Sequence, residues 1–299
     1  MTRMAFIGVG NMGGGMAANQ VKSGRQVAAF DLSAAAVDKA VAHGCSPAAS
    51  VAEAVKEAEI VITMLPAGQH VRQVYEEDIL PNAPTSALLI DCSTIDVDSA
   101  RAVGALARAA GFRFGDAPVS GGIMAADAGT LAFMVGCDEA DYPAYEAALT
   151  PMARAVFHAG ELGSGQAAKI CNNMLLGVSM LGVCESFALA EKLGLDPTRF
   201  FDIASKSSGQ CWSLTTYCPW PGPVETAPSN RGYEGGFLTA LMLKDLKLAQ
   251  EAAARAGATT PMGNQAEALY AMFDGLGFGQ KDFSAVLQLM RGKLGELAS

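Results

Sequence analysis

Apolar runs of strand length alternate with helix-forming segments over the first half of the chain. Several of the runs stop at Gly, Pro or Asp, as buried strands do where they turn into a loop. The runs lie at residues 4–9, 27–30, 60–65, 87–91, 112–117, 131–135 and 155–158. One helical segment between them starts at Ser50-Val51-Ala52-Glu53, which forms a capping box. Strands that alternate with helices predict an α/β fold with a mainly parallel, doubly wound sheet.

From about residue 163 the pattern changes to helices and loops. A helical segment without proline covers residues 164–193, and a new helix begins at Asp196-Pro197, an N-cap followed by proline at the first helical position. Further helices are predicted from near Phe237, from Thr260-Pro261 and from Asp282-Phe283-Ser284. We therefore predict two domains, a sheet domain at 1–163 and an all-α domain at 164–299, joined by the helix at 164–193.

The long helix at 164–193 carries a lysine in an unusual position. At about 100° per residue, Lys169 shares a face with Leu176 and Met180, and the opposite face with Cys171 and Leu189 is also mostly apolar. A helix that is apolar nearly all round is expected to be buried, so Lys169 is expected to be shielded from water. A buried ammonium group is costly unless it is paired or functional. Lys169 is therefore a candidate catalytic residue, with Asn173 one turn further along the same face.

The composition is typical of a folded intracellular protein. The chain has 299 residues, 51% of them hydrophobic and 17% charged, and its net charge of −9 argues against nucleic-acid binding. Seven cysteines without a CxxC pair predict reduced thiols, and three scattered histidines predict no metal site. The first residues lack the layout of a signal peptide, and the longest apolar run, at 174–184, is shorter than a bilayer span. We expect a cytoplasmic protein without a membrane partner.

A glycine loop follows the first predicted strand and precedes a helix. In this position a GxGxxG pattern is typical of a Rossmann-type dinucleotide site, because its glycines permit a tight turn, close approach of the pyrophosphate and close packing of helix on strand. The helix N-terminus then faces the phosphates. The residues concerned are Gly8, Val9, Gly10, Asn11, Met12 and Gly13.

An acidic residue ends the second predicted strand. A carboxylate at Asp31 accepts hydrogen bonds from ribose hydroxyls and repels a 2′-phosphate, and Leu32 and Ser33 offer no cation in its place. We therefore expect NAD as the cofactor, with NADP less favoured, and Arg25 is the residue that could reverse this preference.

Three further loops lie at the carboxyl ends of predicted strands, where doubly wound sheets bind ligands. They are Leu65-Pro66, Ser93-Thr94 and the loop at 117–122. In the last of these, Ser120-Gly121-Gly122 combines a hydroxyl group with exposed main-chain N–H groups, which suits a carboxylate. An ordinary turn is the alternative.

The helical half holds two more candidates. The loop-like segment at 207–236 carries Trp212, Tyr217 and Trp220, for which substrate contact and plain packing stay open alternatives. Lys244 falls on a predicted apolar stripe with Phe237, Leu241 and Leu248. Its charged end either extends past these residues to water or faces an anion in a cleft, and the second is favoured. Asp245 lies about 100° away on the helix.

Four motifs, in order along the whole chain, resemble those of the β-hydroxyacid dehydrogenases. The stretch from Gly8 through Asn19 is similar to the cofactor signature of that family. The other three similar motifs are Asp116-Ala117-Pro118-Val119-Ser120-Gly121-Gly122, Gly163-Ser164-Gly165-Gln166-Ala167-Ala168-Lys169-Ile170-Cys171-Asn172-Asn173 and Lys244-Asp245-Leu246. The resemblance implies that Lys169 is catalytic and that Leu65, Pro66 and Thr94 contact the cofactor. It implies substrate contacts for Asn173, Ser120, Gly121, Gly122 and Asp245, with Lys244 near both ligands.

The segment Tyr217-Cys218-Pro219-Trp220-Pro221-Gly222 is similar to the hydroxyisobutyrate branch of this family, in which Trp212 and Tyr217 match residues of the substrate pocket. Two departures are Gly15 in place of a usual proline and Gln20 in place of a usual leucine. The branch implies a role in valine catabolism and a homodimer or homotetramer. Close relatives act on serine, tartronate semialdehyde or glycerate, and 3-hydroxypropionate.

The expected reaction is hydride transfer between NAD and a small 3-hydroxy carboxylic acid such as 3-hydroxyisobutyrate, with Lys169 as general acid and base. Burial and a second cation such as Lys244 both lower the pKa of a lysine towards the range useful at neutral pH. Two rivals are a non-enzymatic NAD-sensing module and an imine reductase. Both are disfavoured by Lys169, the first also by Asn173 and Ser120.

Overall fold

The computed structural model describes residues 1–297, and the chain divides into two compact units, Met1–Lys169 and Ile170–Ser299. Each unit has hydrophobic core clusters of its own. The division falls inside one helix, α9 (Ser164–Lys192). The predicted domain limits, 1–163 and 164–299, stay a proposal.

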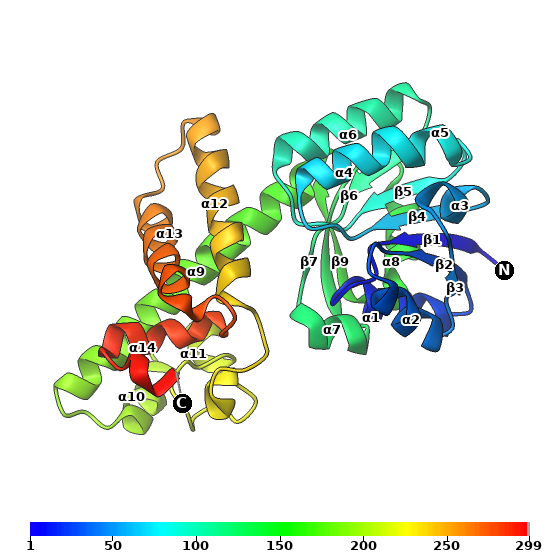
Figure 1. Cartoon of the computed structure of the whole chain (residues 1–299). Helices are drawn as coiled ribbons and strands as arrows, with labels where there is room; N and C mark the ends of the chain where they lie inside the picture. The colour runs from blue at the N-terminus through cyan, green and yellow to red at the C-terminus, as the bar shows by residue number, and fades with distance from the viewer. Residues whose placement is uncertain (298–299) are drawn as a thin grey trace. The chain divides into compact units, whose positions relative to one another are not determined.

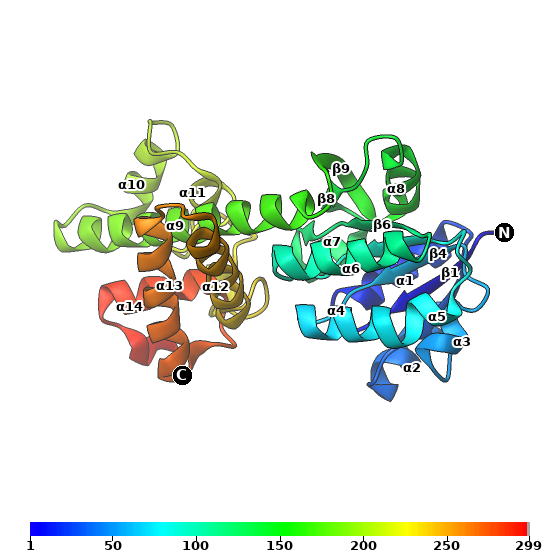
Figure 2. The same ribbon diagram turned by 90° about the horizontal axis from the view of Figure 1, so that it is seen from above.

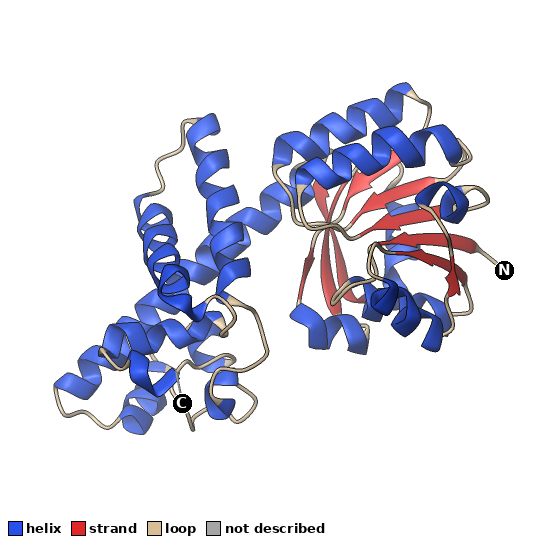
Figure 3. Ribbon diagram, viewed as in Figure 1, coloured by secondary structure: helices blue, strands red, loops and turns tan. Residues whose placement is uncertain are grey.

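The first unit is built on one twisted sheet (Figures 1 and 3). Its strands are β1 (Arg3–Ile7), β2 (Gln26–Phe30), β3 (Ser46–Pro47), β4 (Ile60–Thr63), β5 (Leu88–Asp91), β6 (Arg113–Asp116), β7 (Val119–Ser120), β8 (Leu131–Gly136) and β9 (Ala153–Gly160). They are ordered β3-β2-β1-β4-β5-β6-β8-β7, with β9 paired to β8. All the predicted strands are present, and β1 to β6 are parallel to one another. Beyond them β8 is antiparallel to β6 and β7, and β9 is parallel to β8. The doubly wound Rossmann-type prediction is confirmed.

Helices cover both faces of this sheet (Figure 3). They are α1 (Gly13–Lys22), α2 (Ala34–Ala42), α3 (Val51–Val55), α4 (Gly68–Val74), α5 (Leu80–Asn82), α6 (Val97–Ala109), α7 (Gly122–Ala128) and α8 (Tyr142–Leu149). Alternate strand residues point to opposite faces, so Met4 and Phe6 join the core cluster under α1 while Ala5 and Ile7 join the one under α6. Burial on both faces explains why the parallel strands appear in the sequence as continuous apolar runs.

β2 and β4 flank β1 in the sheet, so the connection after β1 leads to one side of it and the later strands β4 to β6 lie on the other side. This reversal of strand order is a topological switch point, where the loops after neighbouring strands diverge and leave room for a ligand. The loops that follow β1 and β4 carry the predicted cofactor residues.

The second unit is helical, as predicted. Besides the later part of α9, its helices are α10 (Pro197–Ala204), α11 (Trp212–Thr215), α12 (Thr239–Ala256), α13 (Pro261–Phe273) and α14 (Val286–Arg291). Figures 1 and 2 show α12 and α13 side by side. The core of this unit is rich in aromatic rings, and Phe283 contacts the rings of Tyr217, Phe237 and Tyr270.

Two predicted helix faces need correction. On α9 the face with Lys169 is buried, but Cys171, Leu175 and Leu189 are exposed, so the helix is not buried all round. On α12, Leu241 is 44% exposed, whereas the buried face carries Met242 and Leu246. On α12 the exposed charged residues Lys247, Glu251 and Arg255 lie four residues apart and mark the outer face, which the apolar residues alone did not indicate.

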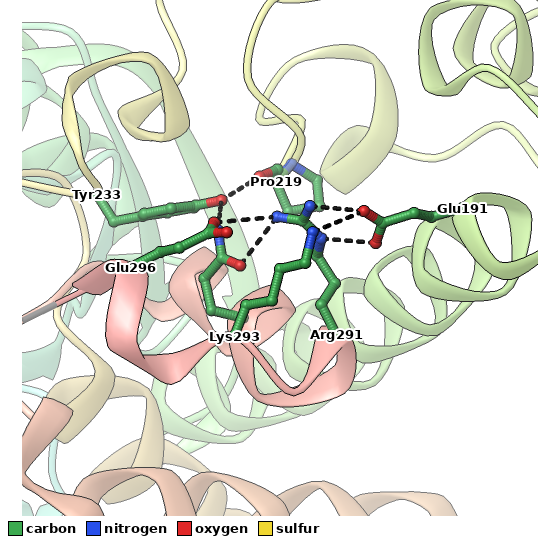
Figure 4. A network of polar contacts seen from close by, with 7 residues as sticks. Glu191, Pro219, Tyr233, Arg291, Lys293 and Glu296 are labelled. Atoms are coloured by element: carbon green, nitrogen blue, oxygen red, sulfur yellow. Dashed lines mark hydrogen bonds and ion pairs between the residues drawn. The ribbon is translucent and has the colours of Figure 1, made fainter.

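The later end of α9 is fixed to α14 by an ion-pair network (Figure 4). Arg291 donates two hydrogen bonds of 2.8 Å to the carboxylate of Glu191, and Lys293 donates a third of 2.9 Å. These bonds lower the pKa of Glu191 to about 2. The guanidinium also lies 4.4 Å from the ring centre of Trp220, which stacks on Phe187. Of the two alternatives for Trp220, this packing supports the structural one.

Candidate active site

The glycine loop after β1 has the geometry that a dinucleotide requires. Gly8 has a φ of +89°, and a Cβ there would lie 2.3 Å from the carbonyl oxygen of Met64. A Cβ on Gly13 would lie 1.9 Å from the carbonyl oxygen of Gly8. Gly10 differs, because its Cβ would meet no atom of the chain within 4 Å. Packing thus explains Gly8 and Gly13, while Gly10 leaves open space beside the loop, as a pyrophosphate needs.

The N-terminus of α1 is prepared for an anion. Met12 precedes α1 and makes no side-chain capping bond, and the first turn holds no acidic residue. Gly10 and Asn11 are exposed, while Val9 is buried and orients the loop. Main-chain N–H groups at a helix start attract phosphate oxygens. The residues of this chain therefore fit a bound dinucleotide.

Asp31 is joined directly to this loop. One carboxylate oxygen accepts a 2.9 Å hydrogen bond from the main-chain N–H of Val9, and the other accepts a 2.8 Å bond from that of Ser33. The carboxylate is therefore held at the carboxyl end of β2, beside the loop. Leu32 is 96% exposed and adds no cation.

Arg25, the cation that could favour NADP, is engaged elsewhere. It precedes β2, at the opposite end from Asp31, and its guanidinium donates to the carbonyl oxygens of Ala147 and Ala148 at 2.8 and 2.7 Å. It also donates a 2.6 Å bond to Gln20, whose own amide donates to Ala148 at 2.9 Å. The unexpected polarity of Gln20 is thus satisfied by a contact between α1 and α8.

The second departure, Gly15, has a packing explanation. A Cβ at this position would lie 2.3 Å from Oδ1 of Asp127 and 2.9 Å from the main chain of Ala126. The amide of Asn19, one turn along α1, donates to the carbonyl oxygens of Gly15 and Ala126 at 2.9 and 2.7 Å. Gly15 therefore lets α7 approach the start of the cofactor helix closely.

The loops after β4 and β5 are joined by a buried polar network. The main-chain N–H of Leu65 donates a 2.8 Å bond to the hydroxyl of Ser93, which donates a 2.6 Å bond to Asp91. Thr63 donates a 2.7 Å bond to the same carboxylate oxygen. Pro66 and Thr94, the other predicted cofactor contacts, lie next to these anchored positions. Their roles stay predictions.

The start of α9 is fixed to the carboxyl end of β6. The carboxylate of Asp116 accepts 2.7 Å bonds from the main-chain N–H groups of Gly163 and Gln166. Desolvation raises the pKa of Asp116 to about 6, although these two bonds act in the opposite direction. Lys169 lies one turn further on and is 6% exposed, so the predicted burial is confirmed.

The predicted carboxylate receptor has an unusual backbone. Ser120 ends β7, and Gly121 and Gly122 have φ values of +138° and +69°, which strongly favour glycine. A Cβ on Gly121 would lie 2.6 Å from the side chain of Ala125, while Gly122 has open space around it. The space beside Gly122 suits a small anion. Its role in substrate binding stays a prediction.

In the second unit, Asn173 and Asp245 form a buried pair. They are 2% and 4% exposed, and the amide of Asn173 donates a 2.5 Å bond to the carboxylate of Asp245. The carbonyl oxygen of Asn173 accepts a 3.0 Å bond from Asn172. Asp245 therefore fixes which way the Asn173 amide points. Lys244 precedes it on α12 and is half-buried.

Trp212 and Tyr217 form a stacked platform. Their ring centres are 4.9 Å apart and their planes differ by 20°, while Trp212 stays 49% exposed. The hydroxyl of Tyr217 donates a 2.7 Å bond to the buried carboxylate of Asp282. Burial and the Asp282 charge raise the pKa of Tyr217, so its hydroxyl stays protonated as a donor.

Two buried polar residues, Asp282 and Gln166, are functional candidates that the sequence analysis did not single out. Asp282 also accepts bonds from the main chain of Phe237 and from the hydroxyl of Ser284, and Gln166 bonds the loop after β5. Gln166 lies three residues before Lys169, on the same side of the helix. This three-residue spacing from Lys169 could have indicated Gln166 in the sequence.

Within residues 1–297 no group of His, Cys, Asp and Glu could hold a metal ion. In the same range α9 alone has the length and composition of a membrane span, and 44% of its most apolar stretch is buried. The apolar run at 174–184 thus belongs to a helix long enough to cross a bilayer. Core helices of folded proteins meet the same criteria, and Met180 and Phe187 are fully buried in the core of the second unit.

Known proteins match both parts of the chain. Residues 3–160 match the family described as the NAD binding domain of 6-phosphogluconate dehydrogenase. Residues 163–290 match that described as NAD-binding of NADP-dependent 3-hydroxyisobutyrate dehydrogenase. A probable 3-hydroxyisobutyrate dehydrogenase of Mycobacterium tuberculosis is 49% identical, over 98% of this chain and 99% of its own.

A second relative and a solved structure have nearly the same identity to this chain. An NAD-dependent L-serine dehydrogenase of Pseudomonas aeruginosa is 48% identical, over 97% of this chain and 98% of its own. The solved structure of Mycobacterium tuberculosis 3-hydroxyisobutyrate dehydrogenase with L-serine has a TM-score of 0.94 at 49% identity, covering 97% of this chain and 99% of its own. The sheet, the glycine loop and these matches define the class, an NAD-dependent dehydrogenase that acts on a CH–OH group. The chain belongs to the β-hydroxyacid dehydrogenase family.

Proposed function

We propose that this chain transfers a hydride between NAD and a small 3-hydroxy carboxylic acid such as 3-hydroxyisobutyrate, with Lys169 as general acid and base. The observation that carries the proposal is the burial of Lys169, 6% exposed, on a helix whose first turn is bonded to the ends of β5 and β6. A lysine held in this way has few positions open to its ammonium group, as proton transfer along a defined line requires.

In the proposed mechanism Lys169, as the neutral amine, removes the proton of the substrate hydroxyl group. A nicotinamide held beside the substrate would accept the hydride from the carbon that bears this hydroxyl group. Asn173, oriented by Asp245, holds the hydroxyl oxygen or the amine in line. In the reverse direction the ammonium group of Lys169 returns the proton.

Substrate contacts are proposed for the residues that the family motifs contain. The hydroxyl of Ser120 and the main-chain N–H groups of Gly121 and Gly122 bind the carboxylate, and Lys244 adds a positive charge. Trp212 and Tyr217 form an aromatic wall, supported by their stacked rings. The cofactor contacts proposed are the glycine loop with Asp31, Leu65, Pro66 and Thr94.

We propose that NAD is used in preference to NADP. The position of Asp31 beside the glycine loop supports this, because its carboxylate repels a 2′-phosphate. The engagement of Arg25 with α8 also supports it. A kcat/KM for NADP equal to or above that for NAD would refute the preference.

L-Serine is a second candidate substrate. A relative named for L-serine is 48% identical, almost the same value as for those named for 3-hydroxyisobutyrate. The two acids share a 3-hydroxyl group and a carboxylate, and differ in a methyl or an amino group on carbon 2. Comparing kcat/KM for 3-hydroxyisobutyrate, L-serine, glycerate and 3-hydroxypropionate decides between them.

The proposed role of Lys169 is tested by Lys169→Ala, with Lys247→Ala on the exposed side of α12 as the control. Loss of general acid–base catalysis lowers kcat by about a hundredfold or more. Turnover is followed as NADH formation, and NADH binding shows that the variant is folded. A Lys169→Ala variant with wild-type kcat would end the proposal.

We also propose a cytoplasmic homodimer or homotetramer with a role in valine catabolism. Leu175 and Leu189 are 66% and 60% exposed and lie two heptads apart, on one side of α9. Exposed leucines aligned on a helix support an interface between subunits. Light scattering at the mass of one chain would refute the oligomer.

A further inference from the structure

Gln166 is a fully buried side chain in the first turn of α9 that the proposed chemistry does not use. Its amide nitrogen donates a 2.7 Å bond to the carbonyl oxygen of Ser93, and its amide oxygen accepts a 3.1 Å bond from the main-chain N–H of Ile95. The two bonds flank Thr94. The amide therefore holds the backbone on both sides of Thr94, as a neighbouring strand would.

The main chain of Gln166 is held as firmly as its side chain. Its N–H donates to Asp116, which also binds Gly163. A Cβ on Gly165 would lie 2.2 Å from the carbonyl oxygen of Met134, so the helix backbone rests directly on β8. The first turn of α9 has little freedom to move relative to the sheet.

The contacts continue from Ser93 to the loop after β4. Ser93 accepts the main-chain N–H of Leu65 and donates to the buried Asp91. A continuous set of hydrogen bonds thus runs from Leu65 through Ser93 to Gln166. Its two ends are a proposed cofactor contact and the helix of the proposed catalytic lysine.

We propose that Gln166 is a positioning residue, which fixes the loop at Thr94 to the helix that carries Lys169. The amide makes the cofactor loop and the lysine one rigid body, so that the proton acceptor keeps a constant position relative to the cofactor. The proposal rests on the roles proposed above for Thr94 and Lys169. The alternative is that Gln166 contributes to stability alone.

The test compares Gln166→Met with Gln20→Met. Both glutamines are fully buried, and each amide donates to a main-chain carbonyl oxygen and accepts a second bond. Methionine keeps the length of the side chain and removes the hydrogen bonds, so both variants are expected to melt below the wild type. Only Gln166→Met is expected to affect the cofactor loop.

Two readouts need no substrate. Gln166→Met raises the Kd for NADH, measured by fluorescence titration, by about tenfold, whereas Gln20→Met stays within about twofold of wild type. In the apo-protein, hydrogen exchange of the Ile95 amide becomes faster in Gln166→Met and stays slow in Gln20→Met, because only the first loses the bond to this N–H. Wild-type Kd and wild-type exchange in Gln166→Met would overturn the proposal.

A double-mutant cycle with Thr94→Ala tests whether Gln166 acts through the loop. In the wild-type background Thr94→Ala is expected to lower kcat/KM for NAD. In the Gln166→Met background the same substitution is expected to lower kcat/KM by less than about a further twofold. Fully additive effects would overturn the proposal. If Gln166→Met does not fold, Gln166→Asn takes its place, because it keeps an uncharged amide but is one methylene group too short for the bonds to Ser93 and Ile95 together.

The outcomes separate this proposal from the proposed function. A wild type that oxidises no 3-hydroxy acid, with the NADH and exchange effects as expected, refutes the substrate and leaves the positioning role intact. If Lys169→Ala is inactive while Gln166→Met keeps the wild-type kcat, Kd for NADH and Ile95 exchange rate, the positioning role is refuted and the role of Lys169 is not.

Discussion

The space beside Gly10 leads to a prediction in which stability and cofactor binding change in opposite directions. In Gly10→Ala the new methyl group meets no atom of the chain within 4 Å, and the backbone there is outside the left-handed region. The folded state therefore accepts the alanine without strain. If the pyrophosphate of the cofactor lies beside this residue, the same methyl group occupies its place.

The magnitudes follow from these contacts. An unstrained Gly→Ala change stabilises by about 0.4–1 kcal/mol through the entropy of the unfolded chain. That corresponds to a rise in Tm of about 1–4 °C. Displacing the pyrophosphate costs one charge-assisted hydrogen bond, about 1.5–3 kcal/mol, so the Kd for NADH rises about 10- to 150-fold.

Thermal unfolding of the apo-protein and fluorescence titration with NADH measure the two effects. Gly13→Ala is the matched control, because its Cβ would lie 1.9 Å from the carbonyl oxygen of Gly8 and must disturb the fold. It is expected to melt well below the wild type. An unchanged Kd for NADH in Gly10→Ala would show that the pyrophosphate does not lie beside Gly10. A Tm several degrees below the wild type would show that the folded state does not accept the methyl group without strain.

Two further variants test the surroundings of the site. The pKa of Asp116 is raised from 3.8 to about 6, so its contribution to stability is fully present below pH 3.8 and is lost as the pH rises through 6. The unfolding free energy of the wild type minus that of Asp116→Asn, measured in urea, should therefore fall by up to about 3 kcal/mol between pH 4 and 7, and a constant difference would contradict this origin. Arg25→Met should lower the unfolding free energy by about 1–3 kcal/mol, because the carbonyl oxygen of Ala147 and the amide oxygen of Gln20 lose their donor, while Ala148 keeps the bond from Gln20. It should leave the NAD to NADP ratio of kcat/KM unchanged, and a fall in the use of NADP alone would assign Arg25 to the cofactor.

The sheet and the cofactor loop were predictable because local physics determines them. Buried parallel strands must be apolar on both faces, and the turn at Gly8 tolerates little other than glycine. The N-cap half of the predicted capping box is present as well, with Ser50 accepting the N–H of Glu53 at 3.1 Å, while the Glu53 carboxylate accepts from the main-chain N–H of Ala49. Each of these signals lies within a few residues of the structure that it predicts.

The faces of the helices were harder to predict, because they depend on partners distant in sequence. Asp245 lay off the predicted stripe of α12, yet it is buried against Asn173, 72 residues earlier in the chain. Gln166 likewise bonds Ser93 across 73 residues. A buried polar side chain and a solvated one appear identical in one sequence, so only the fold separates them.

The close contact at Gly15 has a consequence for protein engineering. Consensus design would replace this glycine by the proline usual in the family, and that ring would collide with Ala126 and Asp127 of α7. The amide of Asn19 donates to the main-chain carbonyl oxygens of these two residues, so the effect of a substitution at position 15 depends on the residues at positions 19, 126 and 127. A proline at position 15 becomes neutral only after α7 has been redesigned, which makes the order of substitutions part of the design.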